Sequence, residues 1–233
     1  MLRLEERYGR PLWRGPALDP VSELVAVILS QNTSDVNSQR AFAALRTRYA
    51  DWQAVIDAPT DELEETIRPG GLARTKAPRI QMVLREIVME RGELELDFLR
   101  ELPLMEARDW LSRLPGIGPK SAAIVLLFSM GRPALPVDTH VYRVSRRLGM
   151  LPPKTDAARA HDILQAALRD DEVYAFHVEL VRHGRDTCRA PRPQCQLCPL
   201  TERCAYFAEL AAADRRGTPA RIPARADAEV AQG

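Results

Sequence analysis

Apolar residues recur along the chain at the spacing of helices rather than strands. Strict alternation of apolar and polar residues, which would indicate β-strands, is nearly absent. The segment after Thr75 gives the clearest helical pattern. Its core-facing stripe consists of Ile80, Val83, Leu84, Ile87 and Val88. The pattern therefore predicts an all-α protein of about ten short helices.

Capping residues and helix breakers give the expected helix boundaries. Asp19 and Pro20 predict a helix start, because Asp caps well and Pro suits the first turn. Ser34 predicts a second start, and Pro69-Gly70-Gly71 predicts a helix end. The expected helices cover 20–31, 35–49, 61–68, 76–92, 105–114, 121–130, 139–150, 156–169 and 172–183.

Composition narrows the class of protein. A chain of 233 residues with 45% hydrophobic and 28% charged residues is typical of a globular protein of one large or two small domains. The apolar run Ala122–Met130 is too short to span a bilayer, and MLRLEERYGR lacks the apolar segment of a secretory signal. We expect a protein of the reducing cytoplasm, with no membrane partner. The segment 211–233 is predicted to be a disordered tail.

The stretch LPGIGPK, residues 114–120, favours a turn that binds an anion. Gly116 and Gly118 permit a tight turn, and Pro119 suits the start of the next helix. Outward amides at Ile117, Gly118 and the helix N-terminus would favour phosphate. A packing corner without a ligand is the alternative, but the apolar pattern extends over sixteen residues and favours phosphate. The positions expected to clamp the two helices are Leu111, Leu114, Ala122 and Leu126.

All four cysteines fall in one short segment with the spacing C-x6-C-x2-C-x5-C. They are Cys188, Cys195, Cys198 and Cys204. Four thiolates so close in sequence suit one metal centre, and both zinc and a [4Fe–4S] cluster accept four cysteines. A reducing compartment argues against disulfides. The same region carries a weak excess of positive charge, from Arg182, Arg185, Arg189, Arg192 and Arg203 against two acidic residues.

These segments together resemble the endonuclease III family of DNA-repair glycosylases. LPGIGPKSAAIVLLFSMGRPALPVDTHVYRV is similar to the hairpin, apolar helix and VDTH segment of that family, and the cysteine spacing and the preceding HGR match its iron–sulfur loop. The resemblance runs from about Leu18 to Cys204. It implies a two-lobed helix-hairpin-helix fold with a six-helix barrel at 21–132. It also implies a [4Fe–4S] cluster domain made of 1–20 and 133–210.

The resemblance also implies two catalytic residues. Lys120, at the end of the hairpin, matches the family's nucleophile, whose neutral amine attacks C1′ of deoxyribose and forms a Schiff base. A phosphate-contacting or exposed lysine is the alternative. Asp138 of VDTH matches the family's carboxylate, which stabilises positive charge on the sugar or assists proton transfer. An aspartate before a helix is also a preferred cap, and both roles are compatible.

Two loops match the family segments that enter the DNA helix. LSQNTSD places Asn32 at the usual position of a gap-filling glutamine, with Gln31 just before it, so either amide is a candidate. Leu72 stands where the family has an apolar wedge. A polar helix cap for the two amides and a buried contact for Leu72 are the alternatives.

Three further residues are candidates for phosphate contacts. The cluster would fold the loop between Cys188 and Cys195, so that Arg189 and Arg192 face DNA. His140 either contacts a phosphate or is a satisfied surface histidine.

The function that the resemblance implies is base excision repair, by a cytoplasmic protein associated with the nucleoid. We expect a monomeric DNA glycosylase that removes oxidised pyrimidines from double-stranded DNA and cleaves at abasic sites by β-elimination. One alternative is a monofunctional mismatch glycosylase, whose relatives lack the hairpin lysine and usually carry an extra domain after the cluster. The other is a non-enzymatic helix-hairpin-helix module that only binds DNA. The joint presence of Lys120 and Asp138 favours the bifunctional enzyme.

Overall fold

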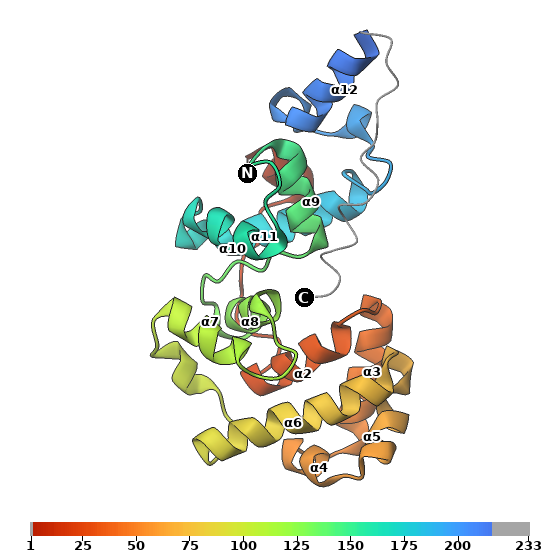
Figure 1. Cartoon of the computed structure of the whole chain (residues 1–233), viewed down its shortest axis with the longest axis vertical. Coiled ribbons are helices and arrows are strands. Elements are labelled where there is room, and N and C mark those ends of the chain that lie inside the picture. Colours follow the sequence, from red (N-terminus) through yellow and green to blue (C-terminus); the bar gives the residue numbers. More distant parts are fainter. Residues whose placement is uncertain (1, 216–233) are drawn as a thin grey trace. The chain divides into compact units, whose positions relative to one another are not determined.

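The computed structural model of the protein describes residues 2–215, and every regular element within that span is a helix (Figure 1). The all-α prediction is therefore confirmed. The chain divides into two units, one made of Gly15–Ala134 and the other of Met1–Arg14 with Leu135–Gly233. The predicted barrel, 21–132, lies inside the first of these. None of the helices within 2–215 combines the length and the apolar character needed to cross a membrane.

The unit Gly15–Ala134 is built around α2, which carries four completely buried side chains, Leu24, Val25, Ile28 and Leu29. Each buried aliphatic side chain contributes about 1.5–3 kcal/mol of hydrophobic stabilisation. The predicted stripe of α6 packs against the same core. The elements of this unit are α2 (Pro20–Ser30), α3 (Asp35–Arg48), α4 (Trp52–Asp57), α5 (Thr60–Ile67), η1 (Arg68–Gly70), α6 (Ala73–Arg91), η2 (Asp97–Arg100), α7 (Leu104–Ser112), α8 (Pro119–Ile124) and η3 (Val125–Ser129).

Two helix starts confirm the capping predictions. The side chain of Asp19 accepts a hydrogen bond from the amide of Ser22 at 2.9 Å, and Pro20 is the first residue of α2. Ser34 caps α3 by accepting from the amide of Asn37 at 3.3 Å. Local side-chain chemistry thus sets both boundaries without help from the rest of the fold.

Other boundaries differ from the prediction. Helix α6 begins at Ala73, three residues earlier than expected, because the carbonyl of Leu72 already accepts from the amide of Lys76 at 2.9 Å. Helix α4 was not predicted, since its six residues are too few to show a period. The expected helix 121–130 is α8 followed by a π-helical turn, η3. There the amide of Arg132 reaches back to the carbonyl of Leu126 at 2.9 Å.

The other unit is organised around the packing of α9 on α11. Gly184 in α11 allows this approach, because a Cβ there would lie 2.9 Å from the Cβ of His140 in α9. Arg143 strengthens the contact by donating to the carbonyl of Gly184 at 2.9 Å. The described elements of this unit are α1 (Leu2–Tyr8), α9 (Thr139–Leu148), α10 (Ala157–Ala166), η4 (Asp170–Glu172), α11 (Val173–Asp186), η5 (Cys195–Leu197), η6 (Thr201–Arg203) and α12 (Ala205–Arg215).

The predicted start of the disordered tail, at residue 211, is wrong. Helix α12 continues through Arg215, so residues 211–215 are helical rather than disordered. The physical reason is the alanine run at 211–213, since alanine has the highest helix propensity and needs no packing partner to favour a helix. The remainder of the predicted tail, 216–233, lies outside the described residues.

Candidate functional site

A helical hairpin joins α7 to α8 through residues 113–118. Ile117 is almost fully buried, and its amide donates to the carbonyl of Leu114 at 3.0 Å. The expectation that this amide faces outward is therefore wrong, because the amide closes the turn. The donors left for an anion are those of the first turn of α8, which have no acceptor within their own helix. The predicted clamp is confirmed, since its residues are all buried in the core: Leu111, Leu114, Ala122 and Leu126.

Lys120 is the second residue of α8 and is half-buried at the mouth of the hairpin. The sequence holds a signal for this residue that pattern reading overlooked. Of 33 lysine and arginine residues, only three are lysines: Lys76, Lys120 and Lys154. Arginine stays protonated in proteins, whereas a lysine amine can lose its proton and act as a nucleophile. A chain that otherwise uses arginine almost throughout thus has an amine at the hairpin.

In the loop after α2, the two candidate gap-filling amides, Gln31 and Asn32, have different surroundings. The Nε2 of Gln31 donates to the carbonyl of Gly116 at 2.9 Å, and its Oε1 accepts from the guanidinium of Arg79 at 3.0 Å. Both ends of the Gln31 amide are therefore engaged within the protein. Asn32 is exposed and has a left-handed backbone, with φ of 53°. Of the two, Asn32 is the side chain presented to solvent.

Leu72 precedes α6 in the same backbone region, with φ of 52°, and its side chain is 56% exposed. A large residue held in this strained region and exposed to solvent is not a buried contact, so that alternative is wrong. Lys76 connects this loop to the previous one. Its buried ammonium donates to the carbonyls of Leu29 at 2.7 Å and Gly70 at 3.0 Å, and burial lowers the pKa of the Lys76 amine.

Asp138 and His140 lie at the start of α9, in the other unit. Asp138 is the N-cap of α9, and its Oδ1 accepts from the amide of Val141 at 2.8 Å. The capping role is confirmed, and it occupies one of the two carboxylate oxygens. The Nδ1 of His140 lies 3.1 Å from Nη2 of Arg143. Since arginine only donates, Nδ1 is the acceptor and Nε2 carries the proton. Burial lowers the pKa of His140, which agrees with a neutral ring.

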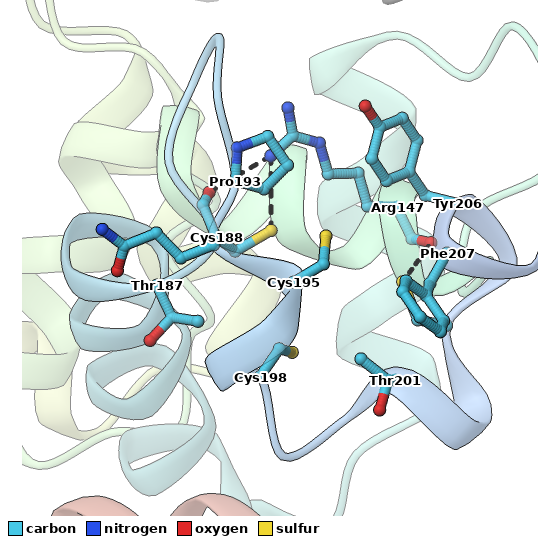
Figure 2. Close-up of a pocket in the computed structure, with 11 residues that line it drawn as sticks. Arg147, Thr187, Cys188, Pro193, Cys195, Cys198, Thr201, Tyr206 and Phe207 are labelled. Carbon is cyan, nitrogen blue, oxygen red and sulfur yellow. Dashed lines mark hydrogen bonds between the residues drawn. The ribbon is translucent and has the colours of Figure 1, made fainter. Parts of the chain in front are cut away.

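The four cysteines line one cavity (Figure 2). Each is a half-buried free thiol. Donors approach two of the sulfurs, since Nη1 of Arg147 lies 3.3 Å from Sγ of Cys188 and the amide of Leu200 lies 3.4 Å from Sγ of Cys198. The other lining residues are Arg147, Thr187, Pro193, Gln194, Thr201, Tyr206 and Phe207.

The electrostatics of this cavity suit a cationic group. Burial raises the pKa of the Cys195, Cys198 and Cys204 thiols, and the neighbouring sulfurs raise these pKa values further. Four thiolates there would repel one another without positive charge between them, which a metal centre supplies. Within residues 2–215 no three histidine, cysteine, aspartate or glutamate side chains already lie close enough together to hold a metal ion.

Helix α1 packs beside the cysteine segment and was not predicted. Arg7 donates to the carbonyl of Leu197 at 2.9 Å, and the hydroxyl of Tyr8 donates to Asp186 at 3.0 Å. His183, from the HGR segment, places Nε2 3.6 Å from Sγ of Cys198, and burial lowers the pKa of His183 to about 4. The N-terminal helix therefore stabilises the backbone that carries the cysteines.

The predicted phosphate-binding arginines are both exposed. Arg189 is held in place by its Nε, which donates to the carbonyl of Asp186 at 2.8 Å at the end of α11. The rest of its guanidinium is available for further contacts. The exposure of Arg192 and Arg189 is consistent with a role on the surface.

Comparison with known proteins identifies the family. Residues 25–169 match the model of the HhH-GPD superfamily of base excision DNA repair proteins. Endonuclease III of Thermotoga maritima is 34% identical over 189 residues, which cover 81% of this chain and 84% of that protein. The chain belongs to the endonuclease III family.

Other members agree with this assignment. Endonuclease III of Bacillus subtilis is 34% identical over 186 residues, covering 80% of this chain and 81% of that protein. A candidate DNA glycosylase of Arabidopsis thaliana is 38% identical over 162 residues, and the match spans 70% of this chain but only 55% of that longer protein. Family membership thus extends over most of the described chain.

Solved structures of family members show the same fold. A trapped covalent intermediate of endonuclease III with DNA matches with a TM-score of 0.76 and 31% identity, covering 89% of this chain and 93% of that one. A non-covalent endonuclease III–DNA complex gives the same score and covers 90% of this chain and 94% of that one. The helix-hairpin-helix glycosylase fold predicted for the chain is confirmed.

Proposed function

We propose that the protein is a base excision repair DNA glycosylase with an associated β-elimination activity, and that Lys120 is its nucleophile. The observation that carries the proposal is the placement of a rare lysine as the second residue of the hairpin helix. A trapped covalent complex with DNA is described for an endonuclease III of the same fold, and a lysine amine is a group that forms such an adduct.

The chemistry follows from a neutral amine at Lys120. Its nitrogen bonds to C1′ as the bond from C1′ to the base breaks, and the base leaves with the bonding electrons and takes up a proton. The nitrogen then loses a proton, and its lone pair forms a C=N bond to C1′ as the C1′–O4′ bond breaks. O4′ takes up a proton, and the product is a protonated imine. Removal of a proton from C2′ then expels the 3′ phosphate.

Asp138, in the other unit, is proposed to supply the carboxylate that stabilises the positive sugar. Oxidised pyrimidines and abasic sites in double-stranded DNA are the proposed substrates of a monomeric enzyme.

The exposed loops provide the proposed DNA contacts. Asn32 is proposed to fill the gap left by the extruded nucleotide, because Gln31 is already bonded at both ends. Exposed Leu72 is proposed to enter the base step as a wedge. Phosphates are proposed to meet the first-turn amides of α8. The side chains proposed to contact phosphates are His140, Arg189 and Arg192.

We further propose that the four cysteines hold a [4Fe–4S] cluster. The set of four thiols around one cavity, with two donors to their sulfurs, fits an iron–sulfur cluster whose iron ions offset the charge of the thiolates. When bound, the cluster supplies a rigid anchor for the segment between α11 and α12. Arg147, His183 and α1 hold the thiols in place, and Arg189 keeps its loop against the end of α11.

The decisive experiment traps the proposed imine with borohydride on duplexes carrying thymine glycol or an abasic site. The substitution Lys120→Arg keeps the charge but removes the ability to form an imine. We expect it to abolish trapping and strand cleavage while leaving binding of the abasic duplex within about threefold. Lys154→Arg is the matched control, because Lys154 is an exposed lysine far from the hairpin in sequence, and it should trap like the natural protein.

The outcome separates the three functions considered. A natural protein that forms no adduct but still releases a base is a monofunctional glycosylase, and one that does neither is a DNA-binding module. If the adduct persists in Lys120→Arg and disappears in Lys154→Arg, the nucleophile is Lys154, and the proposal for Lys120 is wrong.

A further inference from the structure

Three segments of the unit Gly15–Ala134 meet at the outer end of the hairpin turn. Gln31 follows α2, Arg79 lies in α6, and Gly116 is in the turn itself. The Gln31 amide donates to the carbonyl of Gly116 at 2.9 Å and accepts from Arg79 at 3.0 Å. The carbonyl of a tight turn is thus held by a side chain that a cation orients.

The contact between Arg79 and Gly116 is also steric. A Cβ on Gly116 would lie 2.5 Å from Nε and 2.7 Å from Cδ of Arg79, so the guanidinium lies directly against the glycine backbone. Gly116 has φ of 74°, which independently disfavours a side chain. The turn is therefore held at Gly116 by two contacts, the packing of Arg79 and the hydrogen bond from Gln31.

We propose that Gln31 and Arg79 are positioning residues that hold the hairpin turn against α2 and α6 and thereby set the place of the Lys120 amine. The inference rests on the proposed role of Lys120, which lies four residues beyond Gly116. Attack at C1′ needs an amine placed to well under an ångström, and displacement of about 1 Å costs on the order of 100-fold in rate. Gln31 accordingly acts on the protein's own hairpin and not on the orphaned base.

The test is the single-turnover rate of strand cleavage on an abasic duplex, with the enzyme in saturating excess. This first-order rate does not depend on the fraction of enzyme that is folded, so instability alone does not lower it. Gln31→Ala and Arg79→Ala should each slow cleavage at least about tenfold. The double variant should cleave at most about twofold more slowly than the slower single variant, because both residues act through one contact.

Two controls isolate the contact. Arg74→Ala removes an exposed cation from the same end of α6, and it should weaken DNA binding without changing the saturated rate. Gln53→Ala removes an amide from α4, where Gln53 bonds only to Asp57 of its own helix, and it should change neither quantity. Arg79→Lys keeps the charge but loses the planar guanidinium, so it should remain slow.

A second comparison excludes gap filling by Gln31. The duplex is prepared with either a base or an abasic spacer opposite the reacting sugar. Positioning of the hairpin predicts the same slowing of Gln31→Ala on both duplexes, whereas gap filling predicts slowing only where a base is present. Slowing confined to the base-containing duplex, unchanged saturated rates, or single effects that multiply in the double variant would each overturn the inference. A natural protein that fails to cleave either duplex would instead refute the proposed function of Lys120.

Discussion

At the scale of single residues, Asp138 has a structural role and a proposed chemical role, and an alanine variant would remove both. Asp138 caps α9 with one carboxylate oxygen and is proposed to stabilise the reacting sugar with its charge. Asparagine caps helices as well as aspartate does but carries no charge. Substitutions that keep one property and remove the other therefore separate structure from chemistry.

Asp138→Asn should leave the free energy of unfolding within about 0.5 kcal/mol and lower base release about 100- to 10,000-fold. Asp138→Ala should in addition destabilise the protein by about 1 kcal/mol, because the cap is lost. Urea unfolding and single-turnover base release measure the two effects. Full activity of the asparagine variant would show that the carboxylate only caps the helix.

Glu179 offers a residue-scale prediction of pH dependence. It is fully buried in α11, and within the described part of the chain neither of its carboxylate oxygens has a hydrogen-bond partner. Burial, and then repulsion from Glu5, raises the pKa of Glu179 from its ordinary 4.5 to about 7. Arg10 and Arg182 oppose this only partly. A raised pKa means that ionised Glu179 opposes folding, so stability is lost as the pH rises from 4.5 through 7.

Glu179→Leu should therefore stabilise the protein, by about 1–3 kcal/mol at pH 8 and by clearly less at pH 5.5. The full shift corresponds to about 3 kcal/mol, which sets the upper end of this range. Thermal unfolding at the two pH values measures the effect. An equal change at both pH values would show that packing, and not the charge, is responsible.

At the scale of elements, α6 fixes the loops around the hairpin through two cations one turn apart. Arg79 reaches the hairpin through Gln31, and buried Lys76 joins the carbonyls of Leu29 and Gly70. Leu29 lies near the end of α2, just before the loop that carries Asn32, and Gly70 ends η1, just before the loop that carries Leu72. One helix therefore sets the relative positions of the three segments of this unit that are proposed to meet DNA.

Lys76→Met keeps the length of the side chain but leaves two carbonyls without their donor. We expect it to lower the free energy of unfolding by about 2–4 kcal/mol, since each buried unsatisfied group costs about 1–3 kcal/mol. Lys154→Met, at an exposed site, should stay within about 0.5 kcal/mol. A variant at position 76 as stable as this control would show that the ammonium contributes nothing to the loops.

The elements also show how far sequence reasoning reaches. Helices with their own caps, such as α2 and α3, were predicted because Asp19 and Ser34 act locally. Helix α1 was not, because its place depends on contacts with residues about 180–190 positions away, such as Arg7 with Leu197. The inward amide of Ile117 was also missed, since residue types alone do not show which turn amides are already paired.

At the scale of the whole molecule, the motifs identified the family and its fold before any coordinates. They also named the cysteines that line one cavity. They left open which of Gln31 and Asn32 fills the gap in the DNA, because the local sequence does not show that Gln31 bonds to Arg79, 48 residues away. The two residues proposed to carry the chemistry, Lys120 and Asp138, belong to different units. The central claim about the molecule is accordingly the identity of the amine that forms the covalent bond.

That claim has a direct test, because the chain contains three lysines and one terminal amine. The natural protein is trapped with borohydride on an abasic duplex, digested with protease and nuclease, and mapped by mass spectrometry for the residue that carries the reduced sugar. We expect the modification on Lys120 alone. Modification of the terminal amine, of Lys76 or of Lys154 in its place would contradict it.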